Sequence, residues 1–335
     1  MIDRRRYLRL AGAAALAPAF GGLAGAQPII WPERPVYLVV PFAPSTLVDE
    51  IGRVVTARLA EMWGEKIVVE NRKGANGDIA AEVVMRAAPD AYTLLLASIG
   101  FAINGFLAHK NDYDPAADFA PVSLLCTYPH LMTVPPSSPA RSVQDFIAIA
   151  RESTRRLTYA SSSIGTASYL AGELLKSMAR IRMTHVPYPG PGLAFNDVMA
   201  GRVDVMFPSA SVALPLVRTG RLRALAVTSD RRQPWAPELP TLAESGLPGF
   251  SVASWYALFA PARTPPEIIA KISADAAQVV RAPEFPAALD KIALNAAGVA
   301  VTPVGSTPEE LGRFLKAELD KWGPVIAAAQ SKSNE

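Results

Sequence analysis

The sequence predicts an α/β protein in which helices alternate with strands of parallel sheets. Short apolar runs, each about as long as a buried strand, occur at residues 36–40, 92–97, 157–160, 203–207 and 224–227. The segments between them carry apolar residues at helical spacing, as at Leu170, Leu174 and Met178. This alternation is typical of βαβ units, whose strands pair in parallel.

Helix starts are predicted where Ser or Thr is followed three residues later by Asp or Glu. The pairs are Thr46/Asp49, Ser142/Asp145, Thr241/Glu244, Thr264/Glu267 and Thr307/Glu310. In such a capping box the hydroxyl and the carboxylate each accept a hydrogen bond from an amide of the first turn. We therefore expect a helix to begin at each pair.

The first 26 residues predict a cleavable export signal. Arginines 4–6 are followed by Tyr7 and Leu8, then by a stretch rich in Ala, Gly and Leu, and finally by Ala24-Gly25-Ala26. This order is typical of the twin-arginine route, with cleavage near Ala26 and a periplasmic product. The alternative is a disordered basic tail. The apolar stretch is shorter than the roughly 20 residues that a spanning helix needs, so no membrane anchor is expected.

The charge balance excludes two classes of partner. The chain has 33 basic and 30 acidic residues, and removal of residues 1–26 leaves 29 of each. A neutral chain has no electrostatic attraction for nucleic acid or for an anionic membrane surface. Residues 27–335 suit about two domains. The proline-bearing stretches 127–140 and 246–254 are the expected crossovers between them.

Three segments between strands and helices are candidate binding loops. Residues 41–49, Pro-Phe-Ala-Pro-Ser-Thr-Leu-Val-Asp, join the first strand to a helix, and residues 161–168 repeat this arrangement with hydroxyls and a glycine. Residues 98–101 end another strand. Free amides and the positive helix end suit a carboxylate or phosphate at the carboxyl edge of a sheet. Ordinary turns are the alternative.

Catalytic, metal and cofactor motifs are absent from the sequence. There is no Gly-x-Ser-x-Gly elbow and no glycine-rich phosphate loop, and His109, His130 and His185 lack zinc spacing. Cys126 is the only cysteine. We expect no catalytic residue, no metal and no cofactor. A secreted hydrolase built on the serines around Ser161 stays as an alternative, and it requires a base nearby.

Motifs of a known family occur in order along nearly the whole chain. They are Trp31-Pro32-x-x-Pro35, Val39-Val40-Pro41-Phe42, Val68-Val69-Glu70-Asn71-Arg72-x-Gly74-Ala75-x-Gly77, Asp118-Phe119-Ala120-Pro121-Val122-Ser123, Tyr159-Ala160-Ser161, Leu170-Ala171-Gly172-Glu173-Leu174, His185-Val186-Pro187-Tyr188, Leu222-Arg223-Ala224-Leu225-Ala226-Val227-Thr228-Ser229 and Gly246-Leu247-Pro248-Gly249-Phe250. In these motifs the chain resembles the Bug, or TctC-like, solute-binding proteins of tripartite tricarboxylate transporters.

The resemblance implies a two-lobed type II periplasmic-binding-protein fold with the ligand cleft between the lobes. Lobe 1 would comprise residues 27–128 plus 254–335, and lobe 2 residues 129–253. It also implies a monomeric, non-enzymatic receptor that binds a small organic carboxylate and delivers it to the membrane components of a tripartite tricarboxylate-type transporter. A sensory partner of a signalling system is the alternative.

Site residues follow from the resemblance as backbone amides and hydroxyls around one cleft. The ligand-binding residues expected are Phe42, Ala43, Pro44, Ser45, Thr46, Asp49, Ser98, Phe101, Ser161, Ser163, Ile164, Gly165, Thr166, Ala167, Ser168, Tyr188, Pro208 and Ser209. The chain departs from the family at Ser45-Thr46, where two glycines are usual, and at Ser163 and Tyr169, where Gly and His are common. These departures affect ligand identity more than fold.

Overall fold

The structure is a computed structural model that describes residues 30–107, 112–292 and 301–333. All of its helices and strands lie within Trp31–Glu335, which forms one compact unit. The predicted export signal, residues 1–26, lies outside the described residues, and so does His109. Within the described ranges, no helix is both long and apolar enough to cross a membrane.

The first sheet has six strands in the order β11-β4-β10-β3-β1-β2. Their bounds are β1 (Val36–Val40), β2 (Ile67–Asn71), β3 (Thr93–Ser98), β4 (Phe119–Pro129), β10 (Ala253–Pro261) and β11 (Thr302–Pro303). Strand β1 pairs in parallel with β2 and β3, whereas β10 runs antiparallel to both β3 and β4. The sheet is therefore mixed: the expected parallel pairing holds for β1, β2 and β3, whereas β10 and β11 pair antiparallel to their neighbours.

The second sheet has five strands in the order β7-β6-β8-β5-β9. Their bounds are β5 (Leu131–Val134), β6 (Leu157–Ser161), β7 (Met183–Pro187), β8 (Val205–Met206) and β9 (Arg223–Val227). Strand β6 is parallel to β7 and β8, and β5 is antiparallel to β8 and β9. The predicted α/β class is confirmed, with two sheets of mixed direction forming a two-lobed fold.

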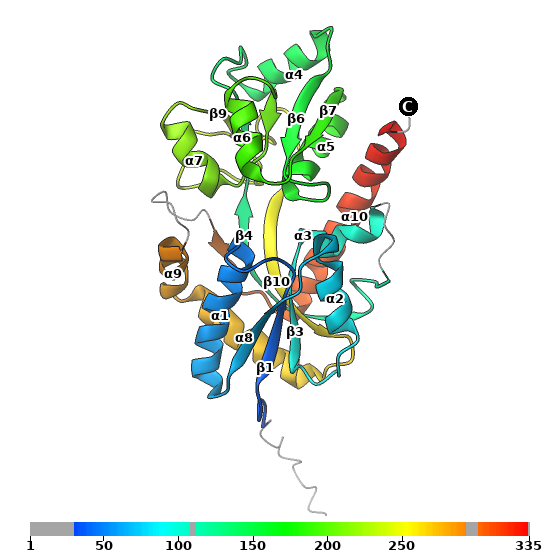
Figure 1. Cartoon of the computed structure of the whole chain (residues 1–335), viewed down its shortest axis with the longest axis vertical. Helices are drawn as coiled ribbons and strands as arrows, with labels where there is room; N and C mark the ends of the chain where they lie inside the picture. The colour runs from blue at the N-terminus through cyan, green and yellow to red at the C-terminus, as the bar shows by residue number, and fades with distance from the viewer. Residues whose placement is uncertain (1–29, 108–111, 293–300, 334–335) are drawn as a thin grey trace, which may run out of the picture. The chain divides into compact units, whose positions relative to one another are not determined.

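Helices cover both sheets (Figure 1). On the first sheet they are α1 (Leu47–Trp63), α2 (Asp78–Met85), α3 (Ile99–Ile103), α8 (Pro266–Arg281), α9 (Glu284–Ile292) and α10 (Pro308–Ser333). With the second sheet are α4 (Val143–Glu152), α5 (Ala167–Ala179), α6 (Pro191–Met199) and α7 (Ala210–Arg218). Two short 3-10 turns, η1 (Ala75–Gly77) and η2 (Asn104–Phe106), lie beside α2 and α3.

The chain passes between the sheets as strand rather than as irregular loop. Strand β4 ends at Pro129 in the first sheet, and β5 begins at Leu131 in the second; β10 takes the chain back. Residues 127–140 therefore begin as strand, because ladder pairing satisfies the backbone hydrogen-bonding groups of a buried crossing segment. A strand that returns from the other sheet can enter antiparallel, which explains the direction of β10. The exact lobe boundaries stay a prediction.

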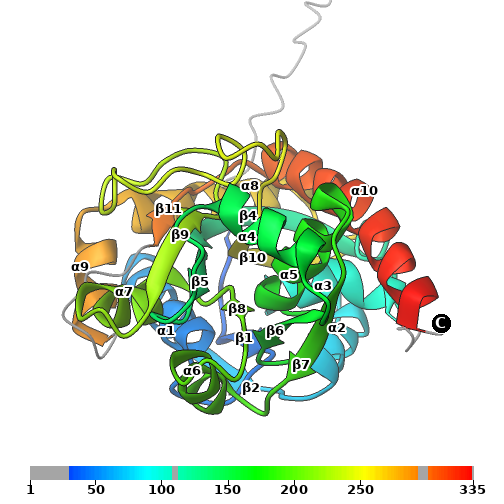
Figure 2. The same cartoon turned by 90° about the horizontal axis from the view of Figure 1, so that it is seen from above.

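Two apolar layers sandwich the first sheet. Val36, Leu38 and Val40 of β1 pack on one side with α1, while Val39 faces the other side. This division follows the two-residue period of a strand. On the second side, buried residues of α10 join the same cluster as those of α5. Helix α10 also contacts α5 directly, as Figures 1 and 2 show, so one apolar cluster spans both lobes.

Three of the five predicted capping boxes form. Ser142/Asp145 and Thr307/Glu310 exchange both hydrogen bonds at the starts of α4 and α10. Thr241/Glu244 does so in a turn that no helix follows. The other two fail because the hydroxyls of Thr46 and Thr264 donate back to carbonyls of the preceding turns instead.

Candidate functional site

A cleft of about 240 Å³ lies between the two sheets. Residues from both sheets and from their crossovers line it. Those that the sequence predicted are Phe42, Ser98, Gly165, Thr166, Ala167, Ser168, Pro208 and Ser209. The structure thus brings together one residue of the first loop, one at the end of β3, the start of α5 and the turn before α7. The volume suits a small organic solute.

The start of α5 presents unsatisfied amides to the cleft. Thr166 caps the helix, and its hydroxyl accepts a hydrogen bond from the Tyr169 amide at 3.3 Å. Leu170 donates to the Thr166 carbonyl. Among the described residues, nothing accepts from the amides of Ala167 and Ser168, both of which line the cleft. These amides and the positive end of the helix form a site for an anion.

Glycines allow the loops of the two lobes to approach closely at this point. A Cβ added to Gly165 would lie 2.8 Å from the Asn76 side chain, and one added to Gly100 would lie 2.6 Å from the Asn76 carbonyl oxygen. Gly165 also has a φ of +83°, which favours glycine. Asn76 therefore lies against both the start of α3 and the loop before α5, at one wall of the cleft.

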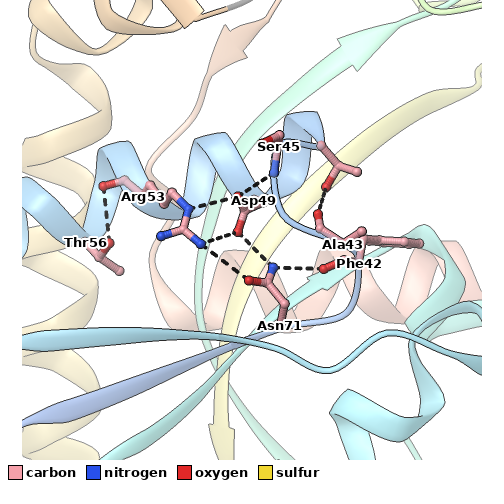
Figure 3. A network of polar contacts seen from close by, with 8 residues as sticks. Phe42, Ala43, Ser45, Asp49, Arg53, Thr56 and Asn71 are labelled. Carbon is pink, nitrogen blue, oxygen red and sulfur yellow. Dashed lines mark hydrogen bonds and ion pairs between the residues drawn. The ribbon is translucent and has the colours of Figure 1, made fainter.

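The first loop arranges its polar groups differently from the prediction (Figure 3). The buried Asp49 carboxylate accepts from the Ser45 amide at 2.9 Å and from the guanidinium of Arg53. It also accepts from the side-chain amide of Asn71 at 2.8 Å. The protein's own carboxylate therefore takes the hydrogen of the Ser45 amide, just before the start of α1. Ser45 reaches this geometry with a φ of 62°, in the left-handed region that favours glycine.

Burial raises the pKa of Asp49, but the hydrogen bonds from Arg53, Asn71 and the Ser45 amide outweigh it, so the pKa is lowered overall. The carboxylate is therefore ionised at neutral pH and acts as a fixed internal anion. Ala43, Pro44, Ser45, Thr46 and Asp49 do not line the cleft.

Other predicted residues lie in the interior or outside the cleft. Phe101 stacks on Tyr113 and is buried. The hydroxyl of Tyr188 donates to Asp197 at 2.6 Å. Ser163 and Ile164 line a separate cavity of about 770 Å³ beside the start of α5. Neither Phe101 nor these three residues line the cleft between the sheets.

Ser161 has a histidine beside it, as a hydrolase would need, yet the serine is buried. Its Oγ lies 2.7 Å from His185 Nε2 and donates to the Ser163 carbonyl at 3.0 Å. Ser161 has no exposed surface and does not line the cleft. Burial lowers the pKa of His185 to about 4. The pair therefore joins β6 to β7 and has no access to a solute in the cleft.

The floor of the cleft consists of residues that the sequence did not single out. They come from the crossovers and are Tyr128, His130, Ser254, Trp255 and Tyr256. His130 and Ser254 are 124 positions apart, and their side chains meet at 2.8 Å. No local pattern marks such a pairing. Asn76 is a further omission, although it falls within the Asn71 to Gly77 motif that carries the family resemblance.

The electrostatic character of the cleft is neutral. No Asp, Glu, Lys or Arg lines it within the described part of the chain. Burial lowers the pKa of His130 to about 4 and raises the pKa values of Tyr128 and Tyr256. Across the described ranges, no cluster of His, Cys, Asp and Glu has the arrangement of a metal site. Recognition of an anion here depends on amides and hydroxyls.

Comparisons with known proteins identify the family of the chain. The sequence model of the "Tripartite tricarboxylate transporter family receptor" matches residues 51–330. A UPF0065 protein from the tcbD-tcbE intergenic region of Pseudomonas sp. (strain P51) is 36% identical over 335 residues, covering 100% of this chain and 97% of that protein.

Two solved structures are similar throughout. Rpa4515 of R. palustris with adipate is 36% identical, with a TM-score of 0.74 and coverage of 90% of this chain and 98% of that one. MatC from Rhodopseudomonas palustris with bound malate is 32% identical, with a TM-score of 0.72 and coverage of 88% and 100%. The predicted resemblance to Bug and TctC-like proteins is confirmed. The chain belongs to the tripartite tricarboxylate transporter receptor family, whose members are solute-binding receptors and not enzymes.

Proposed function

We propose that this protein is a periplasmic receptor that binds a small carboxylated solute between its lobes and delivers it to the membrane components of a tripartite tricarboxylate-type transporter. The observation that carries the proposal is the pair of unsatisfied amides, Ala167 and Ser168, facing a cleft without charged side chains. The related structures that hold adipate and malate support a carboxylate as the ligand.

The solute carboxylate docks on the start of α5. A helix of 13 residues directs its positive end at this point, and Ser98 and Ser209 lie at the starts of α3 and α7 on the same cleft. The first loop contributes Phe42 to the cleft, whereas its Ser45 amide donates to Asp49. Because the ligand contacts both lobes, it favours their closed arrangement through its higher affinity for that state.

The same proposal includes export through the twin-arginine route, cleavage near Ala26 and action as a monomer. So are the lobe boundaries, with residues 27–128 plus 254–335 in lobe 1 and 129–253 in lobe 2. The names of related solved proteins, which include a periplasmic transporter and the periplasmic binding protein BugD, support the location.

The proposal is tested by removing one amide hydrogen. Proline is tolerated at the first helical position, and the extended conformation of Thr166 (ψ 158°) suits a residue before proline. Ala167→Pro should therefore keep α5 and weaken carboxylate binding about ten- to hundredfold, the effect of losing a hydrogen bond to a charged group. Ala167→Gly retains the amide and should bind almost as the parent does.

The measurement is calorimetric affinity for the acids that first stabilise the parent protein in a thermal-shift screen of dicarboxylates, tricarboxylates, acidic amino acids and aromatic acids. A ligand at 100 times its dissociation constant adds about 2.7 kcal/mol to the free energy of unfolding. Equal affinity of the proline and glycine variants would contradict the assignment of the anion site. Failure of every acid to bind would contradict the proposed function.

A further inference from the structure

The loop before α5 has little apolar side-chain support of its own. This α5 loop comprises residues 162–166, between β6 and the first residue of the helix. Ser163 is exposed, Ile164 is 51% exposed, and Gly165 has a φ of +83°, a conformation that favours glycine. Burial of apolar side chains therefore contributes little to the shape of the loop, which leaves hydrogen bonds as its main restraint.

The Ser163 carbonyl is the point at which the α5 loop is tied. It accepts from the Ser161 hydroxyl at 3.0 Å and from the Thr166 hydroxyl at 2.9 Å. Ser161 ends β6, and Thr166 is the N-cap of α5. The two bonds use both lone pairs of the carbonyl oxygen, and they join the end of the strand to the beginning of the helix.

The hydrogen of Ser161 determines the tautomer of His185. If that hydrogen pointed at the imidazole, lone pairs of Ser161 Oγ and of the Ser163 carbonyl would face each other at 3.0 Å. Ser161 therefore donates to the carbonyl, and its oxygen accepts from His185 Nε2, which lies 2.7 Å away. The neutral ring thus carries its hydrogen on Nε2.

Strand pairing and neighbouring rings hold this imidazole in place. His185 lies opposite Tyr159 in the parallel pairing of β7 with β6. Its ring centroid is 4.9 Å from that of Tyr159 and 5.0 Å from that of Tyr169. The imidazole is therefore a fixed donor for the Ser161 oxygen.

Thr166 connects the tied carbonyl to the anion-binding amides. Its hydroxyl hydrogen goes to the Ser163 carbonyl, so its oxygen is free to accept from the Tyr169 amide, and this bond caps α5. Ala167 and Ser168 follow directly and line the cleft. A shift of the Ser163 carbonyl would therefore move the N-cap and turn these amides away from a bound carboxylate.

We propose that Ser161 and His185 are positioning residues, which hold the α5 loop so that the first amides of the helix converge on the solute carboxylate. Neither residue lines the cleft, so both act through the loop. This inference rests on the proposed function and deepens it. The buried pair of serine and histidine, which a hydrolase would use for catalysis, serves here to shape the binding site.

Substitutions that remove or keep a single hydrogen test the proposal. The probe is the acid that binds the parent protein most tightly in the thermal-shift screen, in which malate and adipate are among the dicarboxylates, and calorimetry measures its affinity. Ser161→Ala removes a donor from the Ser163 carbonyl. It should weaken binding about five- to tenfold, the effect of one lost hydrogen bond.

Two variants of His185 separate its hydrogen from the packing of its ring. His185→Gln places an amide N–H where Nε2 lies, and it should bind within about twofold of the parent. His185→Met has a similar length and no donor, and it should bind about as weakly as Ser161→Ala. The double variant Ser161→Ala/His185→Met should bind no more weakly than the weaker single variant, because both residues act through one series of bonds.

Thr158→Val is the control for a loss of stability alone. Thr158 lies near the other end of β6, and its hydroxyl donates to Asp204 at 3.0 Å. The variant should lower the urea midpoint of unfolding and leave the affinity unchanged. Circular dichroism checks that every variant folds.

The outcomes separate this inference from the proposed function. Full affinity of Ser161→Ala, equal affinities of the two His185 variants, additive losses in the double variant, or an equal loss in Thr158→Val would each overturn the inference and leave the receptor function standing. A protein that binds none of the acids would overturn both.

Discussion

At the scale of single residues, the buried Glu318 side chain joins two tryptophans of the interior. Its buried carboxylate accepts from the indole nitrogens of Trp255 at 3.1 Å and Trp322 at 3.0 Å, and it pairs with Lys321. Trp255 belongs to β10 and lines the cleft, while Glu318 and Trp322 belong to α10. One side chain thus connects α10 to the wall of the ligand site.

Removal of that carboxylate should be strongly destabilising. Glu318→Ala leaves two buried indole hydrogens without acceptors, and we expect the free energy of unfolding to fall by about 2–5 kcal/mol. Urea denaturation measures it. Asp320→Ala is the control on the same helix, because its pair with Lys316 is exposed and should contribute less than about 1 kcal/mol. Similar midpoints for the two variants would refute the role given to Glu318.

At the scale of elements, two helix glycines show how packing decides what a residue does. Gly172 of α5 lies against the Tyr159 ring of β6, where an added Cβ would be 2.4 Å from the nearest ring carbon. Gly312 of α10 has space, since the closest atom to an added Cβ is 3.8 Å away on Pro121. The Gly172 contact allows α5 to sit close to the strand that precedes its own loop.

The substitution of glycine by alanine should therefore change the free energy of unfolding in opposite directions at the two positions. Gly172→Ala forces ring and helix apart and should lower the free energy of unfolding by about 1–3 kcal/mol. Gly312→Ala improves helix propensity without a clash and should raise it by up to about 1 kcal/mol. Urea unfolding of the two variants beside the parent decides the matter, and a stabilising Gly172→Ala would show that the α5 contact is wrong.

At the scale of the whole molecule, stability should depend on pH through His130 and His185. Burial lowers the pKa of each to about 4, against about 6.5 in an unfolded chain. Between these values the unfolded chain binds more protons than the folded one, so the free energy of unfolding decreases as the pH falls from about 6.5 towards 4. The stabilisation is fully present above the unfolded pKa.

Each histidine should change the free energy of unfolding by up to about 1.4 kcal/mol per pH unit, and the partly exposed His185 should contribute less than His130. Urea unfolding at pH 7, 6 and 5 measures it, above the range in which most carboxylates titrate. His185→Gln should reduce the slope and retain the part due to His130. A free energy of unfolding that is constant over this range would contradict the buried, neutral state of both rings.

Local patterns determined the α/β class, the starts of α4 and α10, and the place of the Gly165 to Ser168 segment at the start of a helix. These features are predictable because a strand run, a capping box or a turn glycine involves residues a few positions apart. The family resemblance extended this to the two-lobed fold. It placed Phe42, Ser98 and Ser209 near one site, and the structure finds all three on the cleft.

Only the tertiary structure decided what the cleft contains. Asp49 is a cap by its sequence pattern, yet folding places Arg53 and Asn71 around it, and it accepts from the Ser45 amide that precedes its own helix. The floor depends on His130 and Ser254, which become neighbours because β4 and β10 pair over long separation. The hydrogen on His130 Nδ1 is directed at a carbonyl of a third segment, Phe207. Hydrogen-bond direction is a property of the assembled network, and no segment of sequence carries it alone.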